Sequence, residues 1–592
     1  MADSDKDNRI FAAALALAAL AGIFLRCYLL QDQVFGDDEW HGLYFAIGRS
    51  PAWLLTHFSI PGATCIPLNF YTGVLGAATG WSETLLRLPS LIFGILCVVV
   101  CPLVARPIIG TRQAAWLALL LAISPALIFY SRIARPYSTV AFLGFLCVLS
   151  AARWARSGEC CWLWLYVASG ILAVYFHLFA VVTVMTPVLA AVICSFLVRF
   201  SGKPWQVSPP VPAETEQRAA PVVPTRHWII AGVVIVIFSG VLMAPAVIHL
   251  LETKFYNVAF AGDLRLASLP RVAMLWAGVA QPVLVVLFFA ALVTGAFVEC
   301  RRNLYLGIML IGLFPLHALA LLLSRPDSVQ SAIVLVRYSI PLAPVCLLLV
   351  ACGIQAALEG IATRVRFHAS LQALVAFAFV VALSLAGPLP QCYVVPNNFT
   401  SHGAYQHDYR RIDWNHSFHS DFAPAGFTLK TVIDAKEVSP FYKFLGQHPD
   451  GRPIVEYPMM IGDHFNPLYY YQHFHGRPVL VGYATDVVLP AGLSPGNIYG
   501  DTYIDQVLSL VHDPSRLRFH NLVSMDDLPA MRARNVEFIV LHKHFEAQLD
   551  AVAMPLPDIP RLYNKYHAEI GAPVYEDAHI AVFGLTGAQQ AK

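Results

Sequence analysis

Long apolar runs separated by short polar connections make up most of the chain as far as residue 387. A helix needs roughly 20 apolar residues to cross about 30 Å of hydrocarbon. Runs of this kind begin near Ile10, Leu85, Ala114, Tyr137, Trp162, Phe179, Trp228, Ala273, Leu304, Ser339 and Leu371. The pattern predicts an α-helical polytopic membrane protein with about eleven spans. The division between Trp162 and Phe200 is marked only by Tyr175 and His177.

Beyond residue 387 the pattern changes to short apolar runs separated by polar, helix-like stretches. Runs at 453–455, 478–481 and 536–541 predict strands, and 573–583 predicts a hairpin. Residues 388–592 are therefore predicted to form an α/β domain. Fourteen histidines lie between His402 and His579, but none has a metal-binding spacing, so we expect solvated surface histidines here. His473 and His475 are the one pair close enough in sequence to consider as ligands.

Composition agrees with a membrane protein. Hydrophobic residues make up 57% of the chain and charged residues 13%, and the mean hydropathy is +0.60. The first apolar run has no small-residue cleavage site and is followed by many similar runs, so it is predicted to be an anchor. The twelve cysteines show no paired spacing typical of zinc or of a disulfide framework. No basic aromatic patch indicates nucleic-acid binding.

Basic residues fall in alternate connections, and the positive-inside rule assigns these connections to the cytoplasm. They are Arg106, Arg112, Arg153, Arg156, the segment 201–227, Arg301, Arg302, Arg364 and Arg366. The N-terminus is then inside. The loop 31–83 and the domain 388–592 are outside, and 201–227 is a Pro-rich cytoplasmic linker. The membrane domain covers residues 1–387.

An acidic triplet, Asp37-Asp38-Glu39, follows the first apolar run directly. Charged side chains near hydrocarbon are costly, so ionisable residues at this boundary are candidates for function. A carboxylate at the start of a helix can instead serve as a cap, because the helix dipole favours it there. A cap requires one carboxylate, whereas this segment has three.

Basic residues occur on the predicted outer face, where the positive-inside rule does not expect them. Arg132 and Arg135 lie between the third and fourth runs, Arg337-Tyr338 heads the tenth, and Lys254 follows the seventh. Arginine presents a planar five-donor fork that suits phosphate. Snorkelling to lipid headgroups is the alternative for these side chains. Polar residues within spans, such as His317, are predicted to be helix-to-helix partners.

Several motifs occur in an order that resembles the GT-C glycosyltransferases of the family-39 type, which include protein O-mannosyltransferases and lipid A aminoarabinose transferases. The acidic pair Asp38-Glu39 is followed by segments 67–71 (PLNFY), 86–90 (LRLPS), 124–125 (SP), 130–131 (YS), 135–137 (RPY) and 337–338 (RY). The resemblance runs from about Ile10 to Val350. The domain after it is similar to the external domain of bacterial members.

The resemblance implies transfer of a hexose or pentose from a polyprenyl-phosphate donor to a lipid, glycan or protein hydroxyl, with inversion. It places the protein in the bacterial inner membrane, with its active site and C-terminal domain on the extracytoplasmic side, in contact with membrane lipids. Asp38 takes the position of the general base and Glu39 that of its orienting partner. The donor phosphate would be bound by Arg135, Arg337, Arg132, Lys254, Tyr137 and Tyr338. The cavity would also be lined by Asp37, His177, His249, Asn69 and Arg87.

No cofactor is required by this chemistry. The leaving phosphate is already charged and needs cationic stabilisation rather than a proton. A divalent metal, for which Asp37 would be a spare carboxylate, is therefore not favoured. One segment departs from the family pattern, because Thr64-Cys65-Ile66-Pro67-Leu68 has no ionisable residue where members often have one.

Two other classes of function compete with the transferase. A flippase or transporter of lipid-linked sugars would show repeated spans or paired broken helices. The sequence shows no clear repeat, and Gln281-Pro282 is its one candidate break. A membrane scaffold would bind glycan through the domain 388–592 without chemistry.

Overall fold

The computed structural model describes most of the predicted membrane domain and part of the domain that follows. The described residues are 2–28, 30, 39–46, 49–57, 65–79, 83–201, 223–246, 268–279, 281–324, 332–363, 369–387, 389–390, 438–448, 452–457, 471, 474–477, 479–480, 488–489, 528–533, 535–543 and 559–585. The predicted linker 201–227 lies almost wholly outside these ranges.

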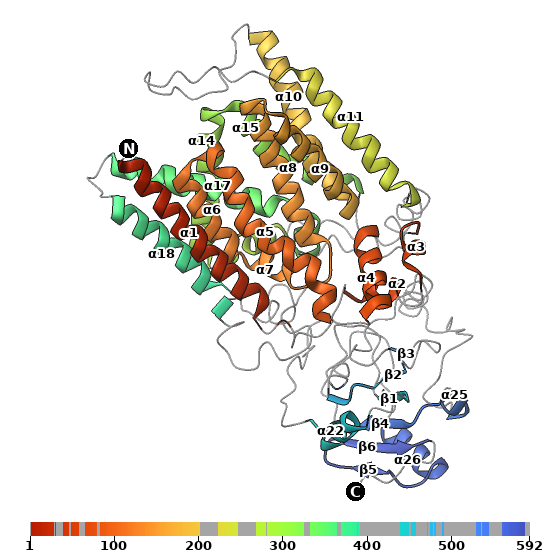
Figure 1. The fold of residues 1–592 in the computed structure, drawn as a ribbon. Helices are drawn as coiled ribbons and strands as arrows, with labels where there is room; N and C mark the ends of the chain where they lie inside the picture. Colours follow the sequence, from red (N-terminus) through yellow and green to blue (C-terminus); the bar gives the residue numbers. More distant parts are fainter. Residues whose placement is uncertain are drawn as a thin grey trace.

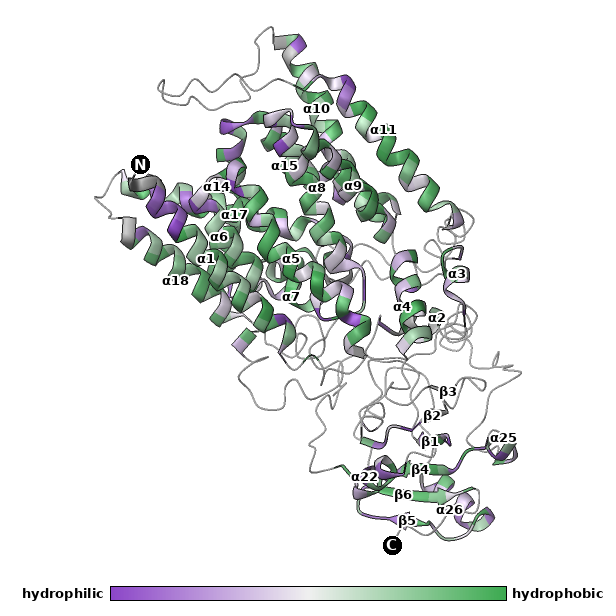
Figure 2. Cartoon of the chain, viewed as in Figure 1, coloured by the Kyte–Doolittle hydropathy of each residue, from purple (hydrophilic) through white to green (hydrophobic). Residues whose placement is uncertain are grey.

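Eight helices in the described ranges are long and apolar enough to cross a membrane. They are α1 (Ala2–Cys27), α5 (Glu83–Ile109), α8 (Tyr137–Ser157), α10 (Val181–Ser201), α11 (Thr225–Leu242), α14 (Pro282–Arg302), α15 (Leu304–Ser324) and α17 (Leu342–Ala362). Figure 2 shows these helices as predominantly hydrophobic ribbons. The protein is a polytopic α-helical membrane protein, as predicted from its apolar runs.

Three further segments correspond to predicted spans. The helices α6 (Thr111–Ile123) and α7 (Pro125–Ser131) together form one candidate span that is bent by 56°. The helices α9 (Cys160–Phe176) and α18 (Ala369–Ala386) are apolar but shorter. The turn predicted near His177 is present, because α9 ends at Phe176 and the short η2 (Leu178–Ala180) leads into α10. A total of eleven spans stays a prediction.

The span predicted to begin at Ala273 starts later. The ten-residue helix α13 (Ser268–Ala277) ends at Gly278, whose φ of +73° suits glycine and stops the helix. Gln281 is extended, as expected for a residue before proline, and Pro282 begins α14. The spanning helix therefore starts at Pro282, nine residues after the predicted start.

The core of the bundle is built around α6, α8 and α17, most of whose side chains are buried. Small residues permit close packing, as is common between membrane helices. A Cβ at Gly295 on α14 would overlap the backbone of α17, and one at Gly353 on α17 would overlap the backbone of α14. These two helices therefore touch through their main chains.

Shorter helices gather at one end of the bundle. They are α2 (Glu39–Ala46), α3 (Pro51–Leu54) and α4 (Ile66–Thr79), all from the predicted outer loop. Pro51 occupies the first turn of α3, where its missing N–H costs nothing, and Ser50 caps that helix by accepting a hydrogen bond from the N–H of Trp53 at 3.2 Å. Figure 1 places the C-terminal sheet beyond this same end.

The C-terminal residues described form a mixed six-stranded sheet of order β3-β2-β1-β4-β6-β5. The strands are β1 (Ile454–Tyr457), β2 (Val479–Leu480), β3 (Val488–Leu489), β4 (Phe538–His542), β5 (Tyr575–Glu576) and β6 (Ile580–Gly584). Strand β1 pairs in parallel with β2 and β4. The predicted hairpin is confirmed as β5 and β6, which pair antiparallel.

Helices cover both faces of this sheet, because strand side chains alternate in direction. Phe538 and Val540 face α22 (Pro440–Gln447), whereas Ile539 and Leu541 face α25 (Leu528–Ala533) and α26 (Ile559–Glu569). The predicted α/β class of this domain is confirmed. The boundary at residue 388 stays a prediction.

Candidate active site

The bend between α6 and α7 creates a short buried loop before α8. Ser124 is extended ahead of Pro125, which begins α7, and the helix stops at Ser131. Residues 132–136 then connect to Tyr137, and every one of them is buried. A buried loop must satisfy its polar groups internally. Two of its five residues are Arg132 and Arg135.

Arg132 holds the loop against the end of α1. Its Nη1 donates to the carbonyl oxygens of Arg26 at 3.1 Å and Tyr28 at 2.8 Å. In return, the buried Arg26 donates from Nε to Ser131 Oγ at 3.2 Å. Cations are favourable at a helix C-terminus, where carbonyl groups have no intrahelical partner. Arg132 therefore binds the end of α1, and its contact with the donor phosphate stays a prediction. The contacts of Arg26 were not predicted from the sequence.

The acidic motif is anchored to the same loop by a buried ion pair. Glu39, at the first residue of α2, accepts from Arg87 on α5 through two 2.8 Å contacts, one to each carboxylate oxygen. The same carboxylate accepts from the backbone N–H of Ala134 at 2.6 Å. The two side chains are only 2% and 0% exposed. Three charge-assisted hydrogen bonds therefore fix Glu39 beside this loop.

Two arginines from distant parts of the chain flank one tyrosine. The guanidinium carbon of Arg135 lies 5.7 Å from the centre of the Tyr137 ring. That of Arg337, on α16 (Ala332–Tyr338), lies 5.6 Å from the same ring. Both distances are within the range in which a cation is attracted to an aromatic face. The fold thus brings together two residues of the predicted phosphate-binding set that are 202 positions apart by their numbers.

Aromatic rings continue from this pair across the end of the bundle. The ring of His177 lies 6.0 Å from that of Tyr137 and 5.9 Å from that of Tyr338. His177 lies between α9 and η2, outside the spanning helices. Burial, and then the positive charges of Arg135 and Arg337, lower the pKa of His177 to about 4. The imidazole is therefore neutral near pH 7.

The start of α4 borders the same group. Burial raises the pKa of the Cys65 thiol to about 12, against the opposing hydrogen bond from the backbone of Leu68 and the positive charge of Arg135. Cys65 is therefore a neutral neighbour of Arg135. On α5, Ser90 Oγ donates to the carbonyl oxygen of Arg135 at 2.6 Å. Neither contact was predicted from the sequence.

The other predicted site residues have different positions. Asn69 is buried on α4, and a Cβ at Gly42 of α2 would lie 3.5 Å from its amide oxygen, so α2 and α4 are neighbours here. His317 lies inside α15, where it contacts Thr183 Oγ1 at 3.2 Å. Its prediction as a helix-to-helix partner is confirmed. Four site residues lie outside the described ranges, namely Asp37, Asp38, His249 and Lys254.

Within the described residues, no group of three or more His, Cys, Asp and Glu side chains is arranged to hold a metal ion. The only carboxylate of the acidic motif that the structure describes, Glu39, has its two oxygens directed to Arg87. Among the described residues, this end of the bundle offers cationic donors and a neutral imidazole. That set can bind an anion.

Comparison with known proteins adds likeness in fold. Neither a protein-family model nor a curated protein matches the chain. Among solved structures, ArnT from Cupriavidus metallidurans in the apo state is 16% identical, covers 100% of each chain and has a TM-score of 0.49. The oligosaccharyltransferase AglB from Archaeoglobus fulgidus is 13% identical over 90% of this chain and 69% of its own, with a TM-score of 0.41.

A third solved structure, the arabinofuranosyltransferase AftD from Mycobacteria, is 13% identical over 98% of this chain and 42% of its own, with a TM-score of 0.42. At these identities and TM-scores the likeness establishes neither family membership nor activity. Function has to be argued from the residues of this chain.

Proposed function

We propose that the protein is an inverting glycosyltransferase that moves a monosaccharide from a polyprenyl-phosphate donor to an acceptor hydroxyl. In this proposal the site lies where Arg135, Tyr137 and Arg337 come together, on the extracytoplasmic side of the bacterial inner membrane. The observation that carries the proposal is the convergence of Arg135 and Arg337 on Tyr137. Two guanidinium groups beside one ring offer paired charge-assisted donors, and this suits a phosphodiester.

The acidic motif supplies the second half of the reaction. Glu39 is held by Arg87 and by the N–H of Ala134, so it is suited to positioning rather than to proton transfer. In the proposal Asp38, the preceding residue, is the base. It takes the proton of the acceptor hydroxyl as that oxygen bonds to the anomeric carbon. The bond from that carbon to the phosphate oxygen breaks on the opposite face, which inverts the configuration.

The leaving group then departs as polyprenyl phosphate, whose added negative charge falls on its oxygens. Arg135 and Arg337 stabilise this charge, which is greater in the transition state than in the bound donor. His177 beside them stays neutral, so the positive charge comes from the two arginines. The products are the glycosylated acceptor, polyprenyl phosphate and the proton on Asp38, which passes to solvent. No step needs a metal ion.

The test is transfer by the full chain reconstituted in lipid nanodiscs, with a panel of radiolabelled polyprenyl-phosphate sugars and an envelope extract as acceptor. Asp38→Asn should abolish transfer while the protein stays folded and membrane-inserted. Arg135→Gln and Arg337→Gln should each lower kcat/KM by about 10- to 100-fold, since each removes a charge-assisted contact worth about 1.5–3 kcal/mol.

The matched control is Arg112→Gln. Arg112 is 44% exposed and pairs with Asp7 at the other end of the bundle, so its loss should leave transfer unchanged. Full activity in Asp38→Asn would remove that residue from the role of base. Movement of an intact lipid-linked sugar across the membrane without release of polyprenyl phosphate would replace the transferase with a flippase. Glycan binding alone, without either reaction, would favour the scaffold.

A further inference from the structure

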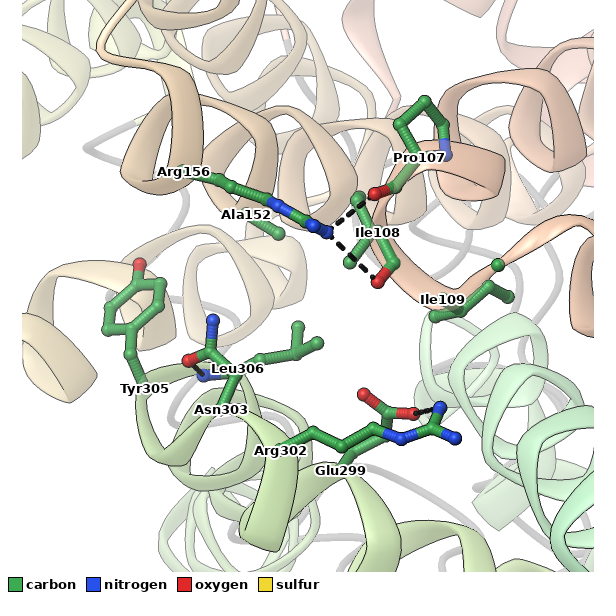
Figure 3. Close-up of a pocket in the computed structure, with 11 residues that line it drawn as sticks. Pro107, Ile108, Ile109, Ala152, Arg156, Glu299, Arg302, Asn303, Tyr305 and Leu306 are labelled. Atoms are coloured by element: carbon green, nitrogen blue, oxygen red, sulfur yellow. Dashed lines mark hydrogen bonds and ion pairs between the residues drawn. The ribbon is translucent and has the colours of Figure 1, made fainter. Parts of the chain in front are cut away.

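A pocket with a mixed-charge lining opens among helix ends that the proposed reaction does not use. Its volume is about 240 Å³, below the ~300–1,000 Å³ of sites for drug-sized ligands, so it suits a small group. Figure 3 shows Arg156 and the carbonyl groups of Pro107 and Ile108 on one side, with Glu299 and Arg302 opposite. The remaining lining residues are Ile109, Gly110, Ala152, Asn303, Tyr305 and Leu306.

This pocket lies at the opposite membrane boundary from the candidate active site. The helix α8 has 21 residues and runs from Tyr137, in the candidate site, to the turn that carries Arg156. At 1.5 Å per residue it is about 30 Å long, which equals the thickness of the hydrocarbon core. Arg156 and Arg302 belong to the predicted cytoplasmic connections. The pocket is therefore at the level of lipid headgroups in the cytoplasmic leaflet.

Arginines on the two opposite sides of the pocket favour an anion. Arg156 donates from Nη1 to the carbonyl oxygen of Pro107 at 2.6 Å, which fixes its guanidinium at the rim. Arg302 is 40% exposed and can turn toward a ligand. The N-termini of α6 and α15, whose N–H groups favour negative charge, also meet here beside Gly110 and Asn303. These groups suit a phosphate.

A carboxylate on the same side as Arg302 favours a cation. Glu299 is only 2% exposed, and within the described part of the chain its Oε1 has no hydrogen-bond partner. Its nearest charge is Arg302 Nη1 at 3.5 Å, which is long for a charge-assisted hydrogen bond. A buried carboxylate oxygen left in this state is costly, and a ligand ammonium would satisfy it.

We propose that this pocket binds the headgroup of an aminophospholipid, with its phosphate at Arg156 and Arg302 and its primary ammonium at Glu299. A ligand with one positive and one negative group matches the paired charges better than a simple anion, which Glu299 would repel. Ile108, Ile109 and Leu306 give the rim an apolar part that suits the glycerol and the first acyl carbons. The inference is independent of the proposed transfer reaction.

The test is lipid retention by the full-length protein in native mass spectrometry, with phosphatidylethanolamine, phosphatidylcholine and phosphatidylglycerol added at equal concentration. We expect phosphatidylethanolamine to be retained best, since its ammonium has hydrogen-bond donors and phosphatidylcholine has none. Arg302→Gln should reduce this retention about tenfold, the loss of one charge-assisted contact. Glu299→Gln should remove the preference over phosphatidylglycerol.

Arg301→Gln is the matched control. Arg301 is adjacent, exposed and of equal charge, but its guanidinium lies over the Phe297 ring at 4.2 Å and does not line the pocket. Its loss should leave retention unchanged. Equal retention of all three lipids, or equal losses in Arg301→Gln and Arg302→Gln, would overturn the proposal. Displacement of the lipid by equimolar phosphoethanolamine or inorganic phosphate would identify a soluble ligand instead and overturn it as well.

Discussion

Two buried carboxylates, one in the helical bundle and one in the C-terminal sheet, are neutralised in different ways. Glu39 receives two 2.8 Å contacts from Arg87, whose charge is permanent, and one from a backbone N–H. Glu456, on β1, is 1% exposed and has His475 Nε2 at 3.5 Å and His542 Nε2 at 3.8 Å. Histidine carries a charge only when it is protonated. The countercharge of Glu39 in the bundle is therefore permanent. The countercharge of Glu456 in the sheet is present only when His475 or His542 is protonated.

The largest effect should come from breaking the pair in the bundle. Glu39→Gln removes the carboxylate that pairs with the guanidinium of Arg87, which is 0% exposed. Removing one partner of a buried pair typically costs about 3–5 kcal/mol. We expect a lower yield of monodisperse protein after detergent extraction and a reduced Tm by intrinsic fluorescence.

A double variant tests whether the reduced Tm comes from the lost ion pair or from an unrelated defect. Adding Arg87→Met to Glu39→Gln removes the unpaired charge and should recover part of the lost Tm. If Glu39→Gln alone extracts and melts like the natural sequence, the pair does not hold α2 to α5. A double variant that melts lower than either single one would contradict the same interpretation.

A smaller, pH-dependent effect is expected in the sheet. Burial raises the pKa of Glu456, but the nearby His475 and His542 outweigh it and hold that pKa below its usual 4.5. A carboxyl group whose pKa is depressed on folding adds stability above its unfolded pKa and loses it as the pH falls through the folded one. The sheet should therefore lose stability as the pH falls below about 4.5.

The measurement is thermal unfolding of the full chain by near-ultraviolet circular dichroism between pH 3 and pH 7. Glu456→Gln should lower stability at pH 7 by about 1–3 kcal/mol, the cost of an unsatisfied buried group. It should also reduce the acid dependence. The exposed His579→Gln is the matched control and should leave the profile unchanged. An acid dependence that Glu456→Gln does not alter would assign it to other carboxylates, such as Asp577.

The smallest effect belongs to the turn between β5 and β6. Asp577 accepts from the N–H groups of His579 and Ile580 at 2.7 and 2.9 Å, and from Ser439 Oγ at 2.6 Å. Asp577→Asn keeps one acceptor oxygen, so we expect a loss of about 1 kcal/mol. Faster hydrogen exchange confined to β5 and β6 would agree with this, and faster exchange across the whole sheet would not.

Most of the secondary structure followed from local pattern. Apolar runs of spanning length form helices, and the shorter runs near 454, 479 and 538 form strands. In both cases the buried residues follow one another in sequence, so their pattern predicts the element. The start of α14 was missed because Gly278 and Pro282 stop and restart the helix inside an unbroken apolar run. Periodicity does not detect such a break, although the two residues themselves signal it.

The contacts of the candidate site depended on tertiary packing and could be predicted only in part. Charge against the positive-inside pattern identified Arg135 and Arg337, and they do lie around one tyrosine. The pairing of Glu39 with Arg87 joins positions 48 apart, and no local pattern specifies it. The expectation of solvated histidines was wrong for His475 and His542, which are 0% and 5% exposed. Their partner Glu456 is distant from both in sequence.

The backbone contact between α14 and α17 has a mechanical consequence. Because Gly295 and Gly353 leave no side chain between the two main chains, neither helix can slide or rotate without a steric clash. The two helices therefore behave as one rigid strut. One end of this strut carries Glu299 and Arg302, and the other continues from Arg337 and Tyr338. A tilt that lipid imposes at one surface of the membrane would therefore displace the arginines at the other surface.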